Sequence, residues 1–229
     1  MPALTNFVAA DWRAGRDRIY FFFKDTDTYT RFDIADNKVA EGYPTATHGR
    51  WGTFDHFKDL RFGFTTTSLG PNAGTDSDVL WFFYYDGNTP MVCKYDQDAD
   101  TVAATSTVAS SQWAPLLPYF SKIVAGTWRE IVGFPFLFTF LLNDGHYLSF
   151  NYKKNTLTRH AITDNSMKGL ERYKDRIVTA AQYDRTLADS YWYIFLTNNE
   201  FLIYNIQLNY VIQGPRKISD ANWPGLLRD

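Results

Sequence analysis

The side chains that could perform catalysis or bind a metal are scattered through this sequence of 229 residues. The run 96–100 (Asp-Gln-Asp-Ala-Asp) begins like a calcium-binding EF-hand loop, but Thr101 replaces the required glycine and Thr107 the bidentate acid. We therefore interpret the run as an ordinary solvated turn. The sequence contains no nucleophile elbow, phosphate-binding glycine loop or zinc-binding helix motif. These observations favour a protein that is not an enzyme.

Histidine and cysteine give no clear metal or haem site either. Two histidines would have to converge to hold a metal or haem, and we expect surface or packing roles for all four, which are His48, His56, His146 and His160. Cys93 is the single cysteine, so an intrachain disulfide and a thiolate zinc cluster are both excluded. We expect that no cofactor is required.

Composition narrows the class of protein. The share of aromatic residues is 18%, and aromatic side chains suit half-buried pleated surfaces, which favours a β-rich fold. The formal net charge of -2 argues against binding to nucleic acid or to an anionic membrane. The first residues have neither a basic segment nor a long apolar run, so we expect a cytoplasmic protein, or one released without a classical signal peptide.

An internal four-fold repeat organises the chain. Each repeat contains an aromatic run followed by a short polar turn, and the runs occupy residues 19–23, 79–85, 134–142 and 191–196. A segment of small residues precedes each run, starting at Val8, Phe62, Val124 and Val178, in steps of 54, 62 and 54 residues. The longer step contains residues 69–78, which are rich in glycine and polar residues and predict a surface loop.

Four repeats of three or four short strands predict an all-β fold, a four-bladed β-propeller, in one domain of residues 1–229. Small residues suit the inner strands, because four strands that converge on one axis leave little room for side chains. We place the blades approximately at residues 6–57, 58–121, 122–175 and 176–229. A short helical segment is expected to close each blade, around residues 51–54, 113–120, 167–173 and 223–227.

The repeat resembles that of the hemopexin-like family. Residues 20–25 (Tyr-Phe-Phe-Phe-Lys-Asp), 29–33 and 42–44 (Gly-Tyr-Pro) follow the family pattern, and the last repeat keeps Gly-Pro at 214–215 and Trp-Pro at 223–224. The resemblance covers essentially the whole chain and implies a four-bladed propeller. It also implies a role in carrying ligands or docking partners.

The resemblance further implies an axial channel in which relatives hold a cation or a chloride. The position where the family often has aspartate holds Val8, Arg61, Val124 and Val178. A Ca²⁺ or Na⁺ ion would therefore depend on the backbone carbonyls of Val8, Val124 and Val178, whereas Arg61 favours chloride. A channel filled by water and side chains is the alternative.

Aromatic residues recur once per blade just beyond the small residues, at Trp12, Phe64, Trp128 and Tyr183. At equivalent positions they would ring one face near the axis and could stack a sugar, a flat apolar ligand or a cation. Packing between blades is the alternative. Arg61 and Arg129 would add hydrogen bonds to an anionic or hydroxylated ligand.

We therefore expect a soluble, lectin-like binding protein that takes up a small molecule or glycan at the axial face. Its binding residues would be Trp12, Arg61, Phe64, Trp128, Arg129 and Tyr183. One alternative is an enzyme that holds substrates in an aromatic-lined axial pocket and promotes cyclisation or cycloaddition by positioning. The other is a protein-interaction platform that uses blade edges or the loop 69–78. No nucleic-acid or membrane partner is expected.

Overall fold

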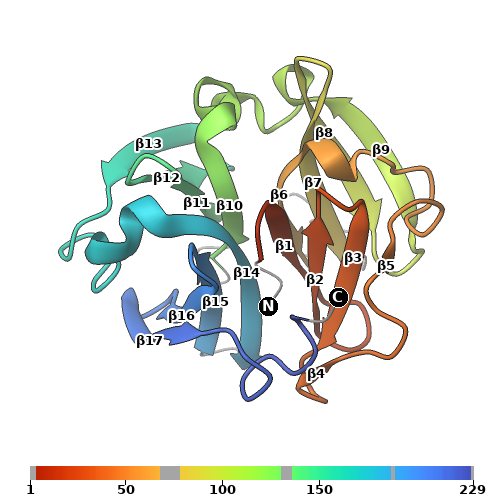
Figure 1. Ribbon diagram of the computed structural model, residues 1–229. Helices are drawn as coiled ribbons and strands as arrows, with labels where there is room; N and C mark the ends of the chain where they lie inside the picture. The colour runs from red at the N-terminus through yellow and green to blue at the C-terminus, as the bar shows by residue number, and fades with distance from the viewer. Residues whose placement is uncertain (1–3, 68–77, 130–135, 187–188, 228–229) are drawn as a thin grey trace.

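The computed structural model describes residues 4–67, 78–129, 136–186 and 189–227 (Figure 1). These residues form four antiparallel sheets arranged in a ring, which is a four-bladed β-propeller with one blade for each sequence repeat. The predicted fold class, a four-bladed β-propeller, is thereby confirmed. Within the described ranges, no helix is both long enough and apolar enough to cross a membrane.

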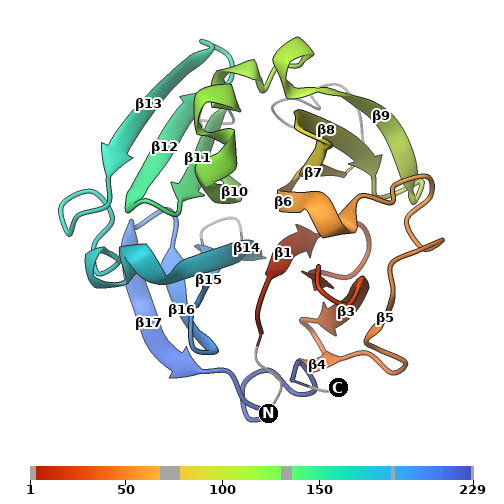
Figure 2. The same cartoon turned by 45° about the horizontal axis from the view of Figure 1, so that its top comes forward.

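Consecutive strands build each blade from the axis outward, and Figure 2 shows the four inner strands meeting at the centre. Blade 1 contains β1 (Phe7–Trp12), β2 (Arg18–Phe23), β3 (Thr28–Asp33), β4 (Lys38–Val39) and β5 (Thr45–Ala46). Blade 2 contains β6 (Leu60–Thr66), β7 (Val79–Asp86), β8 (Thr89–Asp96) and β9 (Thr101–Thr107). Blade 3 contains β10 (Ile123–Trp128), β11 (Leu137–Leu142), β12 (His146–Asn151) and β13 (Thr156–Ala161). Blade 4 contains β14 (Ile177–Thr186), β15 (Asp189–Leu196), β16 (Glu200–Asn205) and β17 (Tyr210–Lys217).

Short 3₁₀ helices lead into three of the inner strands. They are η1 (Phe57–Asp59) before β6, η4 (Ala114–Lys122) before β10 and η5 (Glu171–Arg176) before β14, while η3 (Val108–Ser110) follows β9. Helical segments were also expected at residues 51–54, which form a bend and turns ahead of η1, and at residues 223–227, which form turns instead. Gly225 has a φ of 83° there, which a right-handed helix does not accommodate.

The apolar core lies between the blades, in four clusters of buried side chains that each join two neighbouring sheets. We call the contact between two neighbouring blades a seam, and the same type of turn lies in each of the four seams. In each turn, the carbonyl of one residue accepts a hydrogen bond from the backbone amide three residues later; the accepting residues are Trp51, Trp113, Met167 and Trp223. These four residues are at most 3% exposed. Three seams are therefore filled by an indole, and the seam between blades 3 and 4 has a methionine at the equivalent position.

The narrow part of the ring is filled by residues with little or no side chain. Ala9, Ala10 and Ala180 are buried without measurable exposure on inner strands. Gly126 on β10 shows why: a Cβ atom there would lie 2.7 Å from Phe64 Cδ1 and 2.9 Å from Phe140 Cδ1. Because the two rings are buried in the packed core, neither could move aside without displacing its own neighbours.

Replacing Gly126 by alanine should therefore destabilise the protein. We expect Gly126→Ala to lower the free energy of unfolding by about 1–3 kcal/mol, as typical overpacking does, measured by urea denaturation. The matched control is Gly63→Ala, where a Cβ would lie 3.1 Å from the Trp81 carbonyl oxygen and 3.4 Å from Ala10 Cβ. The control should lose less stability. Equal midpoints for Gly126→Ala and the unaltered chain would contradict the close approach at the axis.

Candidate functional site

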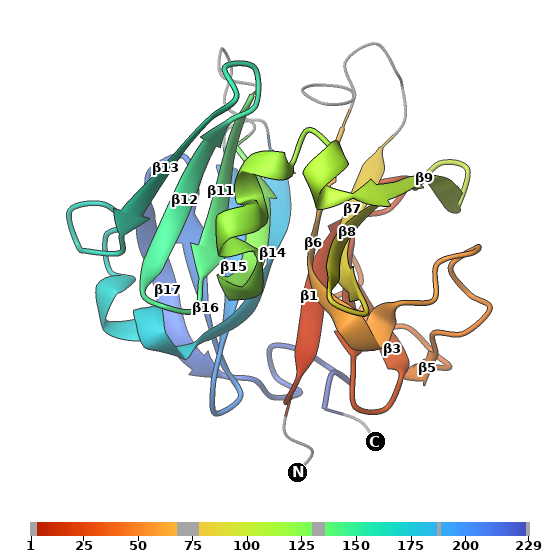
Figure 3. The ribbon, with the colours of Figure 1, turned by 90° about the horizontal axis from the view of Figure 1, so that it is seen from above.

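The inner strands run in one direction, which gives the propeller two distinct faces. The helices η1, η4 and η5 all precede an inner strand, and in Figure 3 β1 starts at the side where the chain ends lie. We call the face where inner strands begin the entry face and the face where they end the exit face. Every predicted site residue can be assigned to one of the two.

The structure separates the two arginines of the predicted site. Arg61 lies at the start of β6, on the entry face, where its Nη2 donates to the carbonyl of Ser121 at 2.7 Å. Arg129 directly follows β10, on the exit face. The six residues expected to form one site therefore lie at opposite ends of the inner strands.

Three of the four predicted ring aromatics pack between blades. Trp12, Phe64 and Trp128 are 6%, 1% and 0% exposed. Trp12 packs edge-on against Trp51 with ring centroids 6.0 Å apart, and Phe64 and Trp128 belong to the cluster between blades 2 and 3. Tyr183 differs because it is half-buried. Phe64 and Trp128 therefore pack between blades, which was the alternative to ligand stacking. Trp12 and Tyr183 also line clefts between blades, which are described below.

Buried polar side chains, which the sequence reasoning did not single out, occupy the exit ends of the inner strands. Asp11, Thr65, Thr127 and Gln182 are each at most 3% exposed. The Thr65 hydroxyl donates to the Asp11 carbonyl at 2.6 Å, and the Thr127 hydroxyl donates to Gln182 Oε1. Gln97 Nε2 donates to the Thr65 hydroxyl at 2.8 Å. The first two bonds connect neighbouring inner strands, β6 with β1 and β10 with β14, and the third joins Gln97 of blade 2 to the inner strand of its own blade.

The positions predicted to face an axial ion share a different feature. Arg61, Val124 and Val178 each fall at a register shift in the first residues of β6, β10 and β14. A register shift of this kind leaves one residue outside the ladder. In blade 1, Val8 instead pairs regularly with Phe22. Ion binding by the carbonyls of Val8, Val124 and Val178, or of chloride near Arg61, stays a prediction.

The histidines do not converge in the structure. His48 and His146 lie beside Asp55 and Asp144, each with 3.2 Å between Nδ1 and a carboxylate oxygen. His56 and His160 stack on tyrosine rings. Across the part of the chain that the structure describes, no three His, Cys, Asp or Glu side chains are close enough to hold a metal ion.

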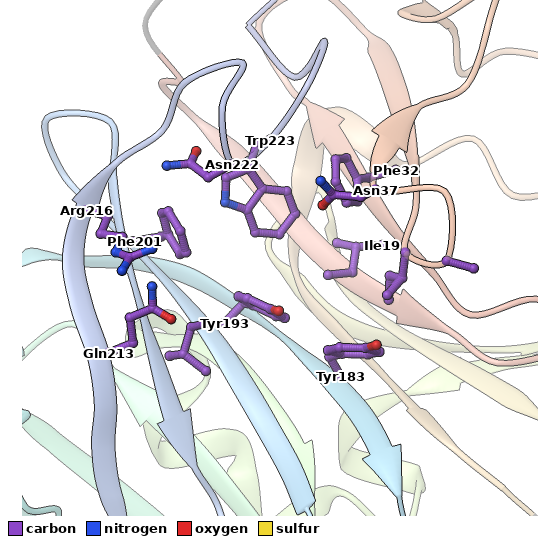
Figure 4. Close-up of a pocket in the computed structure, with 13 residues that line it drawn as sticks. Ile19, Phe32, Asn37, Tyr183, Tyr193, Phe201, Gln213, Arg216, Asn222 and Trp223 are labelled. Atoms are coloured by element: carbon purple, nitrogen blue, oxygen red, sulfur yellow. The ribbon is translucent and has the colours of Figure 1, made fainter.

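A cleft of about 480 Å³, the 4/1 cleft, opens between blade 4 and blade 1 (Figure 4). Five aromatic residues line it: Phe32 on β3, Tyr183 on β14, Tyr193 on β15, Phe201 on β16 and Trp223 beyond β17. Trp223 lies between the two blades, with ring centroids 4.7 Å from Phe32 and 5.3 Å from Tyr193. The walls of the cleft are therefore aromatic on both sides of the seam.

Tyr183 and Tyr193 form a stacked pair within this cleft. Their ring centroids are 5.9 Å apart, their planes differ by 24°, and both side chains are half-buried. Alternation along β15 explains the position of Tyr193, since Trp192 and Ile194 face blade 3 and Tyr193 and Phe195 face blade 1. The pair presents aromatic surface to the cleft that the core does not fully cover.

Amide and guanidinium groups lie at the edge of the same cleft. Gln213 and Arg216 on β17 lie on the blade 4 side and Asn37 on the blade 1 side (Figure 4). The Gln213 amide oxygen, turned toward the guanidinium, accepts from Arg216 Nε at 2.7 Å and Nη2 at 2.8 Å. The lining residues include no carboxylate. The cleft therefore has one positive charge and suits a neutral or anionic ligand better than a cation.

A cleft of about 520 Å³ between blades 1 and 2 is more polar. Three arginines line it: Arg18 Nε and Arg31 Nη2 lie 3.3 Å and 3.2 Å from the two carboxylate oxygens of Asp33, and Arg50 is exposed. Asp100 accepts a hydrogen bond from Tyr95 at 2.7 Å. Most of the charged groups here are thus satisfied within the fold, which favours a structural role for Arg18 and Arg31 over ligand recognition.

Sequence reasoning did not single out Tyr193, Trp223 or Arg216 as binding residues. Two signals were available, because Trp223 is the closing aromatic of its repeat and Tyr193 alternates with a core tryptophan. No repeated pattern marks Arg216. The predicted loop 69–78 lies outside the described residues except for Asp78.

Comparisons with known proteins add little to this geometry. No family model matches the sequence, and no curated protein does. Among solved structures, one described as the Dos1 propeller matches with a TM-score of 0.28 and 12% identity over 90% of this chain. This chain spans about 44% of that one. The four-bladed β-propeller is shown by the four sheets of the chain itself, and the comparisons do not show its family.

The single thiol should be inert in the folded protein. Cys93 has no measurable exposure, and burial raises the pKa of its thiol to about 12. At that pKa about one thiol in ten thousand is ionised at pH 8, and the thiolate is the reactive form. We expect Ellman's reagent to react at least a hundredfold more slowly with the folded protein than with the chain unfolded in guanidinium chloride. Equal rates would contradict both the burial and the raised pKa.

Proposed function

We propose that the protein binds a small molecule or glycan in the 4/1 cleft and releases it unchanged. The observation that carries the proposal is the stacked, half-buried pair Tyr183 and Tyr193 beside the exposed guanidinium of Arg216. Aromatic faces bind flat rings and the apolar faces of sugars, and a guanidinium donates to carboxylate or hydroxyl oxygens. The volume of about 480 Å³ lies within the usual range for ligand sites.

The arrangement of donors suggests how such a ligand would lie. Its ring would stack against Tyr183 or Tyr193, and its oxygen atoms would point toward Gln213 and Arg216 on the blade 4 side. Because no carboxylate lines the cleft, an acidic group on the ligand would meet attraction from Arg216 without repulsion. A flat compound or sugar that carries a carboxylate or several hydroxyl groups fits this chemistry best.

The resemblance to hemopexin-like repeats supports the same proposal. Family members carry ligands or dock partners, and the residues that carry the resemblance include the Gly-Pro and Trp-Pro pairs at 214–215 and 223–224. Trp223 lines the 4/1 cleft and Pro215 precedes Arg216 on β17. We therefore include membership of this family in the proposal.

The cleft can be tested with two variants and a matched control. Ligands found by thermal-shift screening and on a glycan array would be titrated into the wild type, Tyr193→Ala, Arg216→Ala and Tyr210→Ala. We expect Tyr193→Ala and Arg216→Ala each to weaken binding roughly tenfold, the usual effect of losing one stacking or charge-assisted contact. Tyr210 is 37% exposed on β17 and does not line the cleft, so Tyr210→Ala should bind like the wild type.

Two outcomes would contradict the proposal. If every variant binds the ligand as tightly as the wild type, the site lies elsewhere. If mass spectrometry of the ligand recovered after incubation shows a new product, the protein is an enzyme and not only a binding protein.

A further inference from the structure

A third, smaller cleft lies between blades 3 and 4 on the exit face. This 3/4 cleft has a volume of about 220 Å³, and its polar lining includes Arg129, Tyr147, Ser166, Trp192, Tyr204 and Asn209. Met167, which also lines it, stands where the other three seams have a tryptophan. A methionine side chain is smaller than an indole, so this cleft lies at a local departure from the repeat.

Arg129 is a half-buried cation without an acidic partner among the described residues. Its Nη2 donates to the Ile206 carbonyl at 3.3 Å, and its Nε is buried without a hydrogen-bond acceptor. Arg18 and Arg31 pair with Asp33 and Arg176 with Glu200, whereas Arg61, like Arg129, contacts backbone carbonyls and has no ion pair among the described residues. Burying an unpaired charge is costly. An anion in the cleft would remove that cost.

Further hydrogen-bond donors line the same cleft. Trp192 is 1% exposed, and its indole N–H has no hydrogen-bond partner. Burial raises the pKa of Tyr147 and of Tyr204, and this rise outweighs the opposing charge of Arg129 and, for Tyr147, the hydrogen bond with Ser166, so both hydroxyls stay protonated. Tyr204 donates to Asn209 Oδ1. This leaves Arg129, Trp192 and Tyr147 as the groups that could donate to a ligand.

We propose that the 3/4 cleft binds a small oxyanion, a carboxylate, phosphate or sulfate group, with Arg129 as its counter-charge. Among the residues that the structure describes, no carboxylate that would repel it lines the cleft. The volume of about 220 Å³ is below the range typical of drug-sized ligands, so the occupant is an inorganic oxyanion or a short acid. Arg129 and the Trp192 N–H together supply a charged donor and a neutral donor for its oxygen atoms. The site is separate from the 4/1 cleft and does not depend on a ligand there.

The experiment titrates phosphate, sulfate and acetate separately into the protein at constant ionic strength, with sodium chloride as the blank. Binding is followed by calorimetry and by the indole N–H resonance of Trp192, identified as the one missing in Trp192→Phe. We expect at least one of the oxyanions to bind and to shift this resonance. The three arms show which oxyanion the cleft prefers. If none binds the wild type, or if the Trp192 resonance does not move, the proposal is overturned.

Variants separate binding from a structural role of Arg129. Arg129→Gln should weaken oxyanion binding about tenfold or more, as expected for losing a charged hydrogen-bond donor, while Arg172→Gln, at an exposed arginine that lines neither cleft, should bind like the wild type. Without added oxyanion, Arg129→Gln should melt within about 2 °C of the wild type, because the cation it removes has no ion pair. Unchanged oxyanion affinity in Arg129→Gln would overturn the proposal.

A third variant tests the location without touching a donor. Met167→Trp restores the side chain found in the other three seams, and we expect it to fill the cleft and abolish oxyanion binding while the propeller still folds. Met167→Leu, which keeps the volume, should still bind. Wild-type affinity in a folded Met167→Trp protein would overturn the assignment to this cleft.

Discussion

Four inner strands have to pass the same axis side by side, and their close approach is the constraint on which the rest of this propeller depends. Backbone ladders run within each blade, so neighbouring inner strands need other means of contact. Where they are closest, alanine and glycine let a phenylalanine ring of the next blade approach the backbone, as at Gly126. Side-chain hydrogen bonds then link blade to blade, such as the one from the Ala9 amide to the Thr179 hydroxyl at 3.2 Å.

The clefts follow from the same geometry. Sheets that meet at an axis diverge outward, and the widening seam has to be filled by large side chains. Tryptophan enters three seams from the same turn, and methionine enters the fourth. Where the large side chains between two blades do not reach the protein surface, their aromatic rings form the walls of a cleft. The 4/1, 1/2 and 3/4 clefts are therefore features of the seams between blades.

This explains how far the sequence could predict the structure. The repeat, the small inner-strand residues and the hairpin turns have a common period, so the fold and the number of blades could be predicted from them.

The candidate site could not be predicted in the same way, because two consecutive residues of a strand can differ, one lying in the core and the next lining a cleft. Trp128 is fully buried, whereas Arg129, one residue later, lines the 3/4 cleft. Arg61 and Arg129 look equivalent by residue type, yet Arg61 is the second residue of β6 and Arg129 follows the last residue of β10. The 3/4 cleft lies where the sequence departs from the repeat, since Met167 replaces the tryptophan of the other three seams.

Closure of the ring connects stability with the proposed binding site. The first and last blades are joined without a disulfide, by the Leu4 amide donating to Asn199 Oδ1 at 2.8 Å and the Val39 amide donating to the Pro224 carbonyl at 2.9 Å. Trp223 packs against Phe21 and Phe32 of blade 1 and against Phe195 and Phe201 of blade 4. The same indole lines the 4/1 cleft. A ligand in this cleft would contact both blades of the seam that closes the ring. Because a ligand that binds only the folded state stabilises that state, its binding would stabilise the closed ring.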